Sequence, residues 1–199
     1  YRSNSQSRVL EAALLQADIP YRIYGGQRFY ERLEIKNALS YLRLMLNCHD
    51  DVAFERVVNI PTRGIGDRTL EIVRELARDN NTSLWSASVA VVSEKRMAAR
   101  ATNAITAFIE LVNEMSGQFD EQPLAEQAEN AMQHSGLIEM HRREKGERGQ
   151  ARVENLEELV GACRNFEAED RDLPVLPQFL DQVALDSGDR QADEDQDAV

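Results

Sequence analysis

A mainly α-helical fold is predicted by three features of this 199-residue sequence. From Tyr30 onward, apolar residues recur three and four positions apart, which is the spacing of one face of an α-helix. Only residues 20–24 have the composition of a strand. The chain is 42% hydrophobic and 29% charged, and no apolar run approaches the ~18 residues that span a membrane. We therefore expect a globular domain of several helices that contacts no membrane.

The start of the chain is expected to contain one helix and one short strand. Asn4 or Ser5 can cap a helix over Ser5–Ala17, which has an apolar face. Residues 20–24, Pro-Tyr-Arg-Ile-Tyr, are rich in strand-forming side chains and precede two glycines. A helix that leads into a strand is typical of the edge of an α/β domain. The helical stretch that follows would then be a separate domain inserted after that strand.

The remaining elements follow from apolar periodicity. Ile35, Ala38, Leu39 and Leu42 lie on one stripe that continues to Leu46, which predicts a helix of about four turns. Further helices are expected at 50–59, 67–80, 83–93, 96–116, 123–135, 137–145, 148–168 and 174–186. Their apolar stripes are interpreted as core and not as cofactor contacts. The end of the chain, from Gly188, is acidic and is expected to be a linker.

The stretch most informative about function is the turn between the helices predicted at 50–59 and 67–80. Residues 60–70 read Ile-Pro-Thr-Arg-Gly-Ile-Gly-Asp-Arg-Thr-Leu. A short turn with Gly-Ile-Gly between two helices is the sequence form of a helix-hairpin-helix, which holds nucleic-acid backbone. Gly64 and Gly66 can adopt positive φ and let the main chain approach a ligand closely. The N–H groups there, with the next helix N-terminus behind them, would suit a phosphate.

The charges around the turn fit the same interpretation. Arg63 and Arg68 place positive charge on either side of it, and Asp67 is expected to be the N-cap of the next helix. Residues 1–100 carry 15 Lys/Arg and 12 Asp/Glu, a net charge of +3, whereas residues 101–199 carry 8 and 23, a net charge of −15. The basic half would therefore meet a polyanion. Two alternatives stay open. The turn could need its glycines only for the geometry of a corner between two helices, and the acidic second half could reflect only solvent-exposed, soluble helices.

Catalytic and metal-binding patterns are not visible in the sequence. Cys48 and Cys163 stand far apart without CxxC spacing, so we expect neither a disulfide framework nor a zinc site. The three histidines are scattered and form no Ser-His or Cys-His arrangement. The phosphate-binding pattern Gly-x-x-x-x-Gly-Lys-Ser/Thr does not occur. We therefore expect no catalytic residue, no metal and no cofactor in this chain, and a cytoplasmic location.

Several separated motifs resemble one family in the right order. Residues 1–8 (YRSNSQSR) and 20–26 (PYRIYGG) resemble the start of the second half of the UvrD/Rep/PcrA helicases, and 29–38 (FYERLEIKNA) and 152–159 (RVENLEEL) continue the match. Residues 61–66 (PTRGIG) fall where those enzymes carry their duplex-contacting turn. The resemblance covers essentially the whole chain.

The resemblance implies a fragment of a superfamily 1 helicase, which uses ATP and Mg²⁺ to move 3′→5′ on single-stranded DNA in DNA repair. Residues 1–24 would be the edge of the RecA-like motor domain 2A, 25–187 the helical 2B accessory domain, and 188–199 an acidic return linker to domain 2A. In the family, domain 2B rotates as a rigid body, contacts duplex ahead of the fork and restrains unwinding. The fragment itself would not hydrolyse ATP, and its parent would be cytoplasmic and nucleoid-associated.

Site residues follow by position from the same resemblance. Those expected to touch duplex DNA are Thr62, Arg63, Gly64, Ile65 and Gly66, with Arg68 added for its charge. Asn4, and more weakly Arg2, would contact single-stranded DNA. Arg152, Glu154 and Asn155 match a family motif, but their helix has a strong apolar stripe, so we favour ion pairing and packing for them.

The expected partners are duplex at a single-strand/double-strand junction, the motor domains of the same chain, and repair or transcription proteins. The competing class is a protein-docking module without direct DNA contact. Replacing both Gly64 and Gly66 with alanine distinguishes the two classes, because only DNA contact should then be lost.

Overall fold

The computed structural model of the chain describes residues 29–117, 122–170 and 172–188. The helix predicted at Ser5–Ala17, the strand at 20–24 and residues 189–199 of the predicted linker lie outside the described residues. Asn4 and Arg2 lie outside them too.

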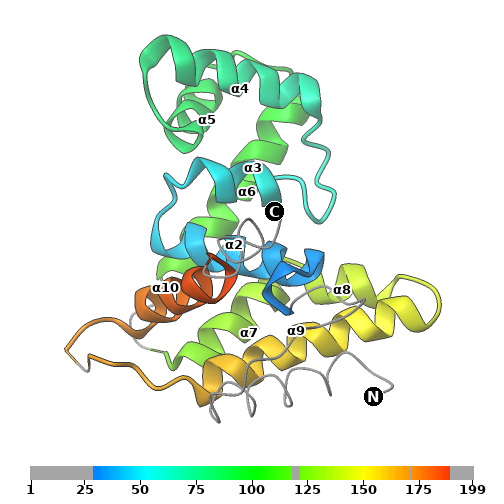
Figure 1. Cartoon of the computed structure of the whole chain (residues 1–199). Coiled ribbons are helices and arrows are strands. Elements are labelled where there is room, and N and C mark those ends of the chain that lie inside the picture. Colours follow the sequence, from blue (N-terminus) through cyan, green and yellow to red (C-terminus); the bar gives the residue numbers. More distant parts are fainter. Residues whose placement is uncertain (1–28, 118–121, 171, 189–199) are drawn as a thin grey trace, which may run out of the picture.

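The described residues form one short 3₁₀ helix and nine α-helices, and they contain no strand (Figure 1). This confirms the predicted mainly α fold. The elements are η1 (Phe29–Glu31), α2 (Leu33–Leu46), α3 (Asp51–Val57), α4 (Asp67–Asn80), α5 (Leu84–Ser93), α6 (Ala99–Gly117), α7 (Leu124–His134), α8 (Leu137–Arg142), α9 (Glu147–Asn165) and α10 (Val175–Gly188). The bounds differ from the predicted ones by a few residues, most at the beginning of α6 and at the ends of α3, α8 and α9.

Helix α2 is the centre of the domain. It contacts α3, α6, α7, α9 and α10, and it is buried on most of its circumference, because apolar residues occupy more than one stripe of it. Its fully buried members include Ile35, Tyr41, Leu42 and Leu44. A helix with this pattern needs partners on several sides, and the other helices supply them.

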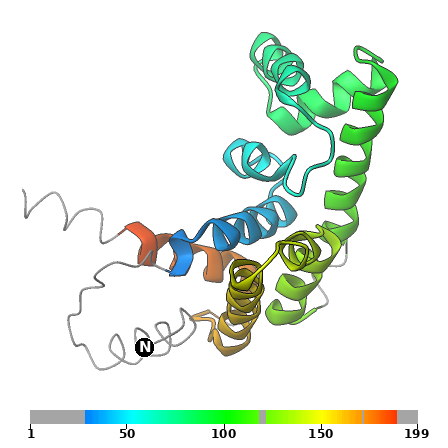
Figure 2. The ribbon, with the colours of Figure 1, turned by 90° about the vertical axis from the view of Figure 1, so that its right-hand side faces the viewer.

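The remaining helices form two groups on either side of α2 (Figures 1 and 2). The contacting pair α4 and α5 lies at the top of Figure 1, and α7, α8 and α9 lie at the bottom. The 19-residue helix α6 contacts α5, α2 and α7, and it therefore connects the two groups. Phe108 of α6 packs edge-on against Phe54 of α3, with ring centroids 5.6 Å apart, and both side chains are fully buried.

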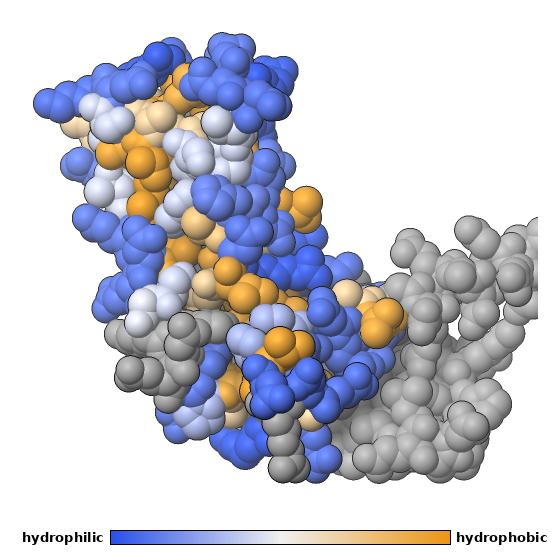
Figure 3. Space-filling view, turned by 90° about the vertical axis from the view of Figure 1, so that its left-hand side faces the viewer, coloured by the Kyte–Doolittle hydropathy of each residue, from blue (hydrophilic) through white to orange (hydrophobic). Residues whose placement is uncertain are grey.

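The surface is mostly polar, with some large apolar side chains exposed. On the side that α5 and α10 occupy, apolar side chains form a band between polar ones (Figure 3). The exposed large apolar residues of the described part are Leu33, Leu46, Val52, Val89, Leu173, Val175 and Leu185. None of the described helices is long and apolar enough to cross a membrane.

Candidate nucleic-acid interface

The Gly-Ile-Gly turn lies between α3 and α4, and its two glycines differ in conformation. Gly64 has φ +81°, a value that favours glycine, whereas Gly66 has φ −90° and ψ 174°. Of the two glycines that can adopt positive φ, only Gly64 does so. Gly66 is also the N-cap of α4, and Asp67, predicted to be the cap, is the first helical residue. A β-carbon added at either glycine would meet no atom within 4 Å.

The side chain of Asn59 fixes the shape of the turn. Its Oδ1 atom accepts hydrogen bonds from the main-chain N–H groups of Arg63, at 2.8 Å, and Ile65, at 3.2 Å. The Ile65 side chain is buried in the core. Because one amide oxygen holds two main-chain groups, the turn is shaped before any ligand arrives. Ile65 therefore anchors the turn and does not present its side chain to solvent.

The Arg63 side chain points into the domain. Its guanidinium donates to the carbonyl oxygens of Pro61, at 3.0 Å, Val57, at 3.4 Å, and Ser135, at 2.8 Å. It also lies over two aromatic rings, 5.8 Å from the centroid of Tyr41 and 5.5 Å from that of Phe108. A guanidinium suits this position because it presents five donors in a fixed plane. The structure thus gives Arg63 a structural role in place of the expected outward-facing charge.

The outer surface of the turn offers main-chain donors. Thr62, Gly64, Gly66, Asp67 and Arg68 are exposed. Within the part of the chain that the structure describes, the N–H groups of the two glycines and of the first two residues of α4 donate to no acceptor. Unpaired N–H groups at a helix start suit an anion such as a phosphate.

Tyr41 supports the turn from the interior of the domain. Its hydroxyl donates to the carbonyl oxygens of Ile60, at 2.5 Å, and Val57, at 3.3 Å. Burial raises the pKa of Tyr41 to about 12, and the nearby Arg63 charge opposes this shift. Neither Tyr41 nor Asn59 was identified from sequence. An asparagine just before a turn is a common turn-stabilising residue and could have signalled Asn59, but nothing local marks Tyr41.

The raised pKa of Tyr41 predicts a pH dependence of stability. The phenol ionises near pH 10 when unfolded and near pH 12 when folded, so the free energy of unfolding falls as pH rises from about 10 to about 12. Tyr41→Phe should lower the free energy of unfolding by about 1 kcal/mol at neutral pH, because the hydrogen bonds of the hydroxyl are lost. The variant should also lose less stability than the unmodified protein as the pH rises above about 10. Urea denaturation of both proteins at pH 8, 10 and 11 checks this. An identical alkaline loss in the variant would contradict it.

The motif at residues 152–159 builds a polar cluster between α2 and α9. Arg152 donates to both oxygens of Glu144, at 2.7 and 2.9 Å, and lies 3.9 Å from Glu34. Asn155 is buried, donates to Glu34 at 2.6 Å and accepts from Arg32 at 3.0 Å. The favoured role in ion pairing and packing is therefore confirmed for Arg152 and Asn155. Glu154 is exposed and accepts a hydrogen bond from Gln150.

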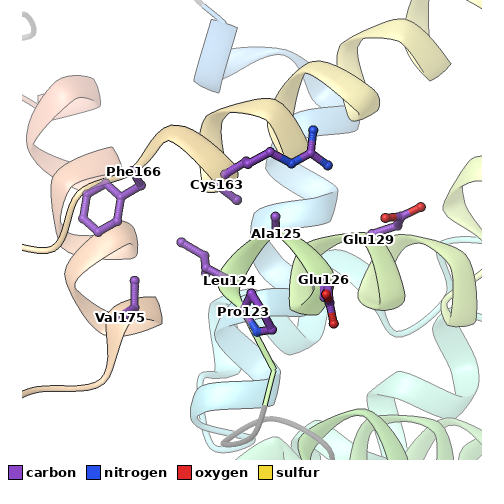
Figure 4. A pocket seen from close by; sticks show the side chains of 9 residues that line it. Pro123, Leu124, Ala125, Glu126, Glu129, Cys163, Phe166 and Val175 are labelled. Atoms are coloured by element: carbon purple, nitrogen blue, oxygen red, sulfur yellow. The ribbon is translucent and has the colours of Figure 1, made fainter.

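A cavity of about 330 Å³ lies away from the turn (Figure 4). The beginning of α7, the end of α9 and the beginning of α10 line it. Its lining residues are Pro123, Leu124, Ala125, Glu126, Glu129, Cys163, Arg164, Phe166 and Val175. No turn residue belongs to this set. Among the described residues, no group of three or more His, Cys, Asp or Glu side chains is placed to hold a metal ion.

Comparison with known proteins identifies the family. The model of the UvrD-like helicase C-terminal domain matches residues 1–199. DNA helicase II of Escherichia coli is 56% identical over 201 residues, and that of Haemophilus influenzae is 52% identical over 201 residues. Both matches cover 100% of this chain and 28% of the relative. The ATP-dependent DNA helicase PcrA of Bacillus subtilis is 38% identical over 93% of this chain and 25% of its own length. The chain thus spans little more than a quarter of these relatives, and it belongs to the UvrD-like helicase C-terminal domain family.

Proposed function

We propose that residues 25–187 are the 2B accessory domain of an ATP-dependent 3′→5′ DNA repair helicase, and that residues 1–24 are the edge of its motor domain 2A. Residues 188–199 then lead back to domain 2A. The domain contacts the backbone of duplex DNA at a single-strand/double-strand junction. The observation that carries this proposal is the exposed row of unpaired main-chain N–H groups at Gly64, Gly66 and the start of α4.

The roles of the turn residues divide into two groups. Gly64, Gly66 and Thr62 offer main-chain or hydroxyl donors to phosphate oxygens, and Arg68 adds an exposed positive charge. Arg63 and Ile65 shape the turn from inside. Main-chain amides read no base, so recognition is independent of DNA sequence.

Weak affinity is part of the proposal. At the turn alone, two or three neutralised phosphates give a salt slope of about −2 to −3, and non-specific binders of this kind have a Kd near 10⁻⁴ M at physiological salt. Such a contact biases the orientation of a rigid domain without locking it. The motor domains supply the remaining affinity, and they hold the ATP and Mg²⁺ of the parent protein. Asn4 and Arg2 contact single-stranded DNA on the motor side.

An NMR titration of the chain with a short hairpin duplex at low salt tests the proposal. We expect the amide signals of Gly64, Gly66 and Arg68 to shift, and the acidic helices to stay unchanged. A second hairpin of unrelated sequence should give the same shifts. If residues 62–68 do not respond, the turn is architectural, and docking of repair or transcription proteins, through the exposed apolar band in Figure 3, becomes the better account.

The two glycines should respond differently to alanine. Gly64→Ala places a β-carbon at φ +81° and should cost about 1–2 kcal/mol of stability or distort the turn, with loss of duplex binding. Gly66→Ala needs no change of backbone, and its small capping cost is offset by reduced freedom of the unfolded chain, so stability should change by under about 0.5 kcal/mol. Urea denaturation and the hairpin titration measure both effects. Equal loss in the two variants would contradict the assigned conformations.

A further inference from the structure

A second basic surface lies at the connection between α8 and α9. We define the α8–α9 corner as residues 142–148, with the sequence Arg-Arg-Glu-Lys-Gly-Glu-Arg. It holds four of the eight Lys and Arg residues of the acidic half of the chain. Arg142, Lys145 and Arg148 are exposed, and they pair with no carboxylate among the residues that the structure describes.

The carboxylates near the corner cancel little of this charge. Glu144 is drawn inward by His141, at 2.7 Å, and by Arg152, and these contacts hold the pKa of Glu144 below its usual range. Glu139 pairs with Arg143 at 2.8 Å. Glu147 is the one remaining exposed carboxylate of the corner. The three unpaired cations therefore leave a net positive surface.

The corner is coupled to the turn through α8. Ser135, just before α8, accepts the hydrogen bond from Arg63, and a β-carbon on Gly136 would lie 3.6 Å from the ring of Pro61. Helix α8 then runs six residues, about 9 Å, from this contact to the corner. Figure 1 shows both the turn and the corner projecting on its right-hand side, and both face the viewer in Figure 2.

We infer that Arg142, Lys145 and Arg148 form a second phosphate contact on the same duplex that the turn holds. This inference rests on the proposed function. Each strand of a duplex carries one phosphate per about 3.4 Å of helix axis, so a bound duplex presents a continuous row of phosphates. Two basic surfaces on the same side of the domain can therefore contact separate phosphates of one duplex. Two contacts fix the direction of the duplex axis, which one flexible contact cannot do.

The test compares two variants that each remove two arginines and one lysine. The first is Arg142→Gln, Lys145→Gln and Arg148→Gln. The matched control is Lys95→Gln, Arg96→Gln and Arg100→Gln, at the exposed connection between α5 and α6 and in the first turn of α6. Both variants and the unmodified chain are titrated with a hairpin duplex at about 50 mM and about 200 mM salt, with amide shifts recorded at each.

We expect the corner variant to lose about three phosphate contacts, or about 2.7 of the salt slope. The unmodified chain should then lose roughly 40-fold more affinity than the corner variant between the two salt concentrations. The control variant should keep most of the original slope. The turn amides should still shift in the corner variant at high DNA concentration.

Failure of this inference differs from failure of the proposed function. If the corner variant and the control behave alike while the turn amides shift, the second contact is wrong and the proposed function stands. If corner amides shift but turn amides do not, the turn is not a phosphate site, and the inference of two contacts on one duplex is overturned too. If an acidic peptide shifts the corner amides as strongly as the duplex does, the corner is not specific for nucleic acid and the inference is overturned.

Discussion

Arg63→Ala is expected to lower the free energy of unfolding by about 3 kcal/mol. The substitution removes the donor from three carbonyl oxygens and the cation from two aromatic faces. Hydrogen bonds from a charged donor contribute about 1.5–3 kcal/mol each but are not additive, and each cation–π contact adds about 0.5–1 kcal/mol. Urea denaturation at neutral pH measures the effect. Duplex binding should weaken as well, because the turn loses its inner support.

Arg68→Ala is the matched control, because Arg68 has the same side chain and is exposed at the start of α4. It should change stability by less than about 0.5 kcal/mol. It should instead reduce the salt slope of duplex binding by about 0.9, the value for one phosphate contact. Arg63→Lys should restore only part of the stability, since an ammonium cannot reproduce the planar fork. Equal stability of the two alanine variants would show that the inward contacts of Arg63 contribute nothing.

Gly149→Ala is expected to destabilise the domain by about 2 kcal/mol. Gly149 is buried in α9, and a β-carbon there would lie 2.5 Å from the carbonyl oxygen of His141 and 2.7 Å from that of Glu144. These are main-chain atoms, so α8 or its connection to α9 would have to move. Overpacking of this kind costs about 1–3 kcal/mol and outweighs the helix preference of alanine, which is worth about 1 kcal/mol.

Gly161→Ala provides the comparison in the same helix. A β-carbon at Gly161 would meet no atom within 4 Å, so alanine should stabilise α9 by about 0.5–1 kcal/mol. Thermal unfolding of the two variants should thus move in opposite directions. Stabilisation by both would mean that α8 does not pack closely against α9. The Gly149 variant should also shift the amide signals of the α8–α9 corner, which is built on this contact.

The helices could be predicted from the sequence because their apolar residues recur with helical spacing. The directions of individual side chains could not be predicted in this way. Strong stripes such as that of α2 need only the spacing of residues along one helix. Arg63 depends on Tyr41, Phe108 and Ser135, which come from three other parts of the chain, and no local pattern brings them together. A charged residue beside a Gly-Ile-Gly turn therefore looked like a surface charge.

The glycines of the turn show a similar limit. Two glycines separated by one residue are equally permissive in sequence, yet only Gly64 adopts a conformation that favours glycine. The difference arises from Asn59, whose single oxygen binds the N–H groups on both sides of Gly64 and bends the chain there. Gly66 lies beyond that bend, where the chain is already extended and enters α4. Spacing reveals the presence of the turn, but its internal hydrogen bonds decide the role of each glycine.

The hydrogen bond between Arg63 and Ser135 joins residues 72 positions apart and has a mechanical consequence. A turn that contacted only its two flanking helices could move independently of the rest of the domain when a force acted on it. Here a force applied at the turn passes directly into α7 and α8, and through α9 to the polar cluster at the start of α2. The turn is therefore joined to the rest of the domain by more than its two flanking helices. Under the proposed function, a force from the bound duplex would be transmitted along these contacts to the start of α2.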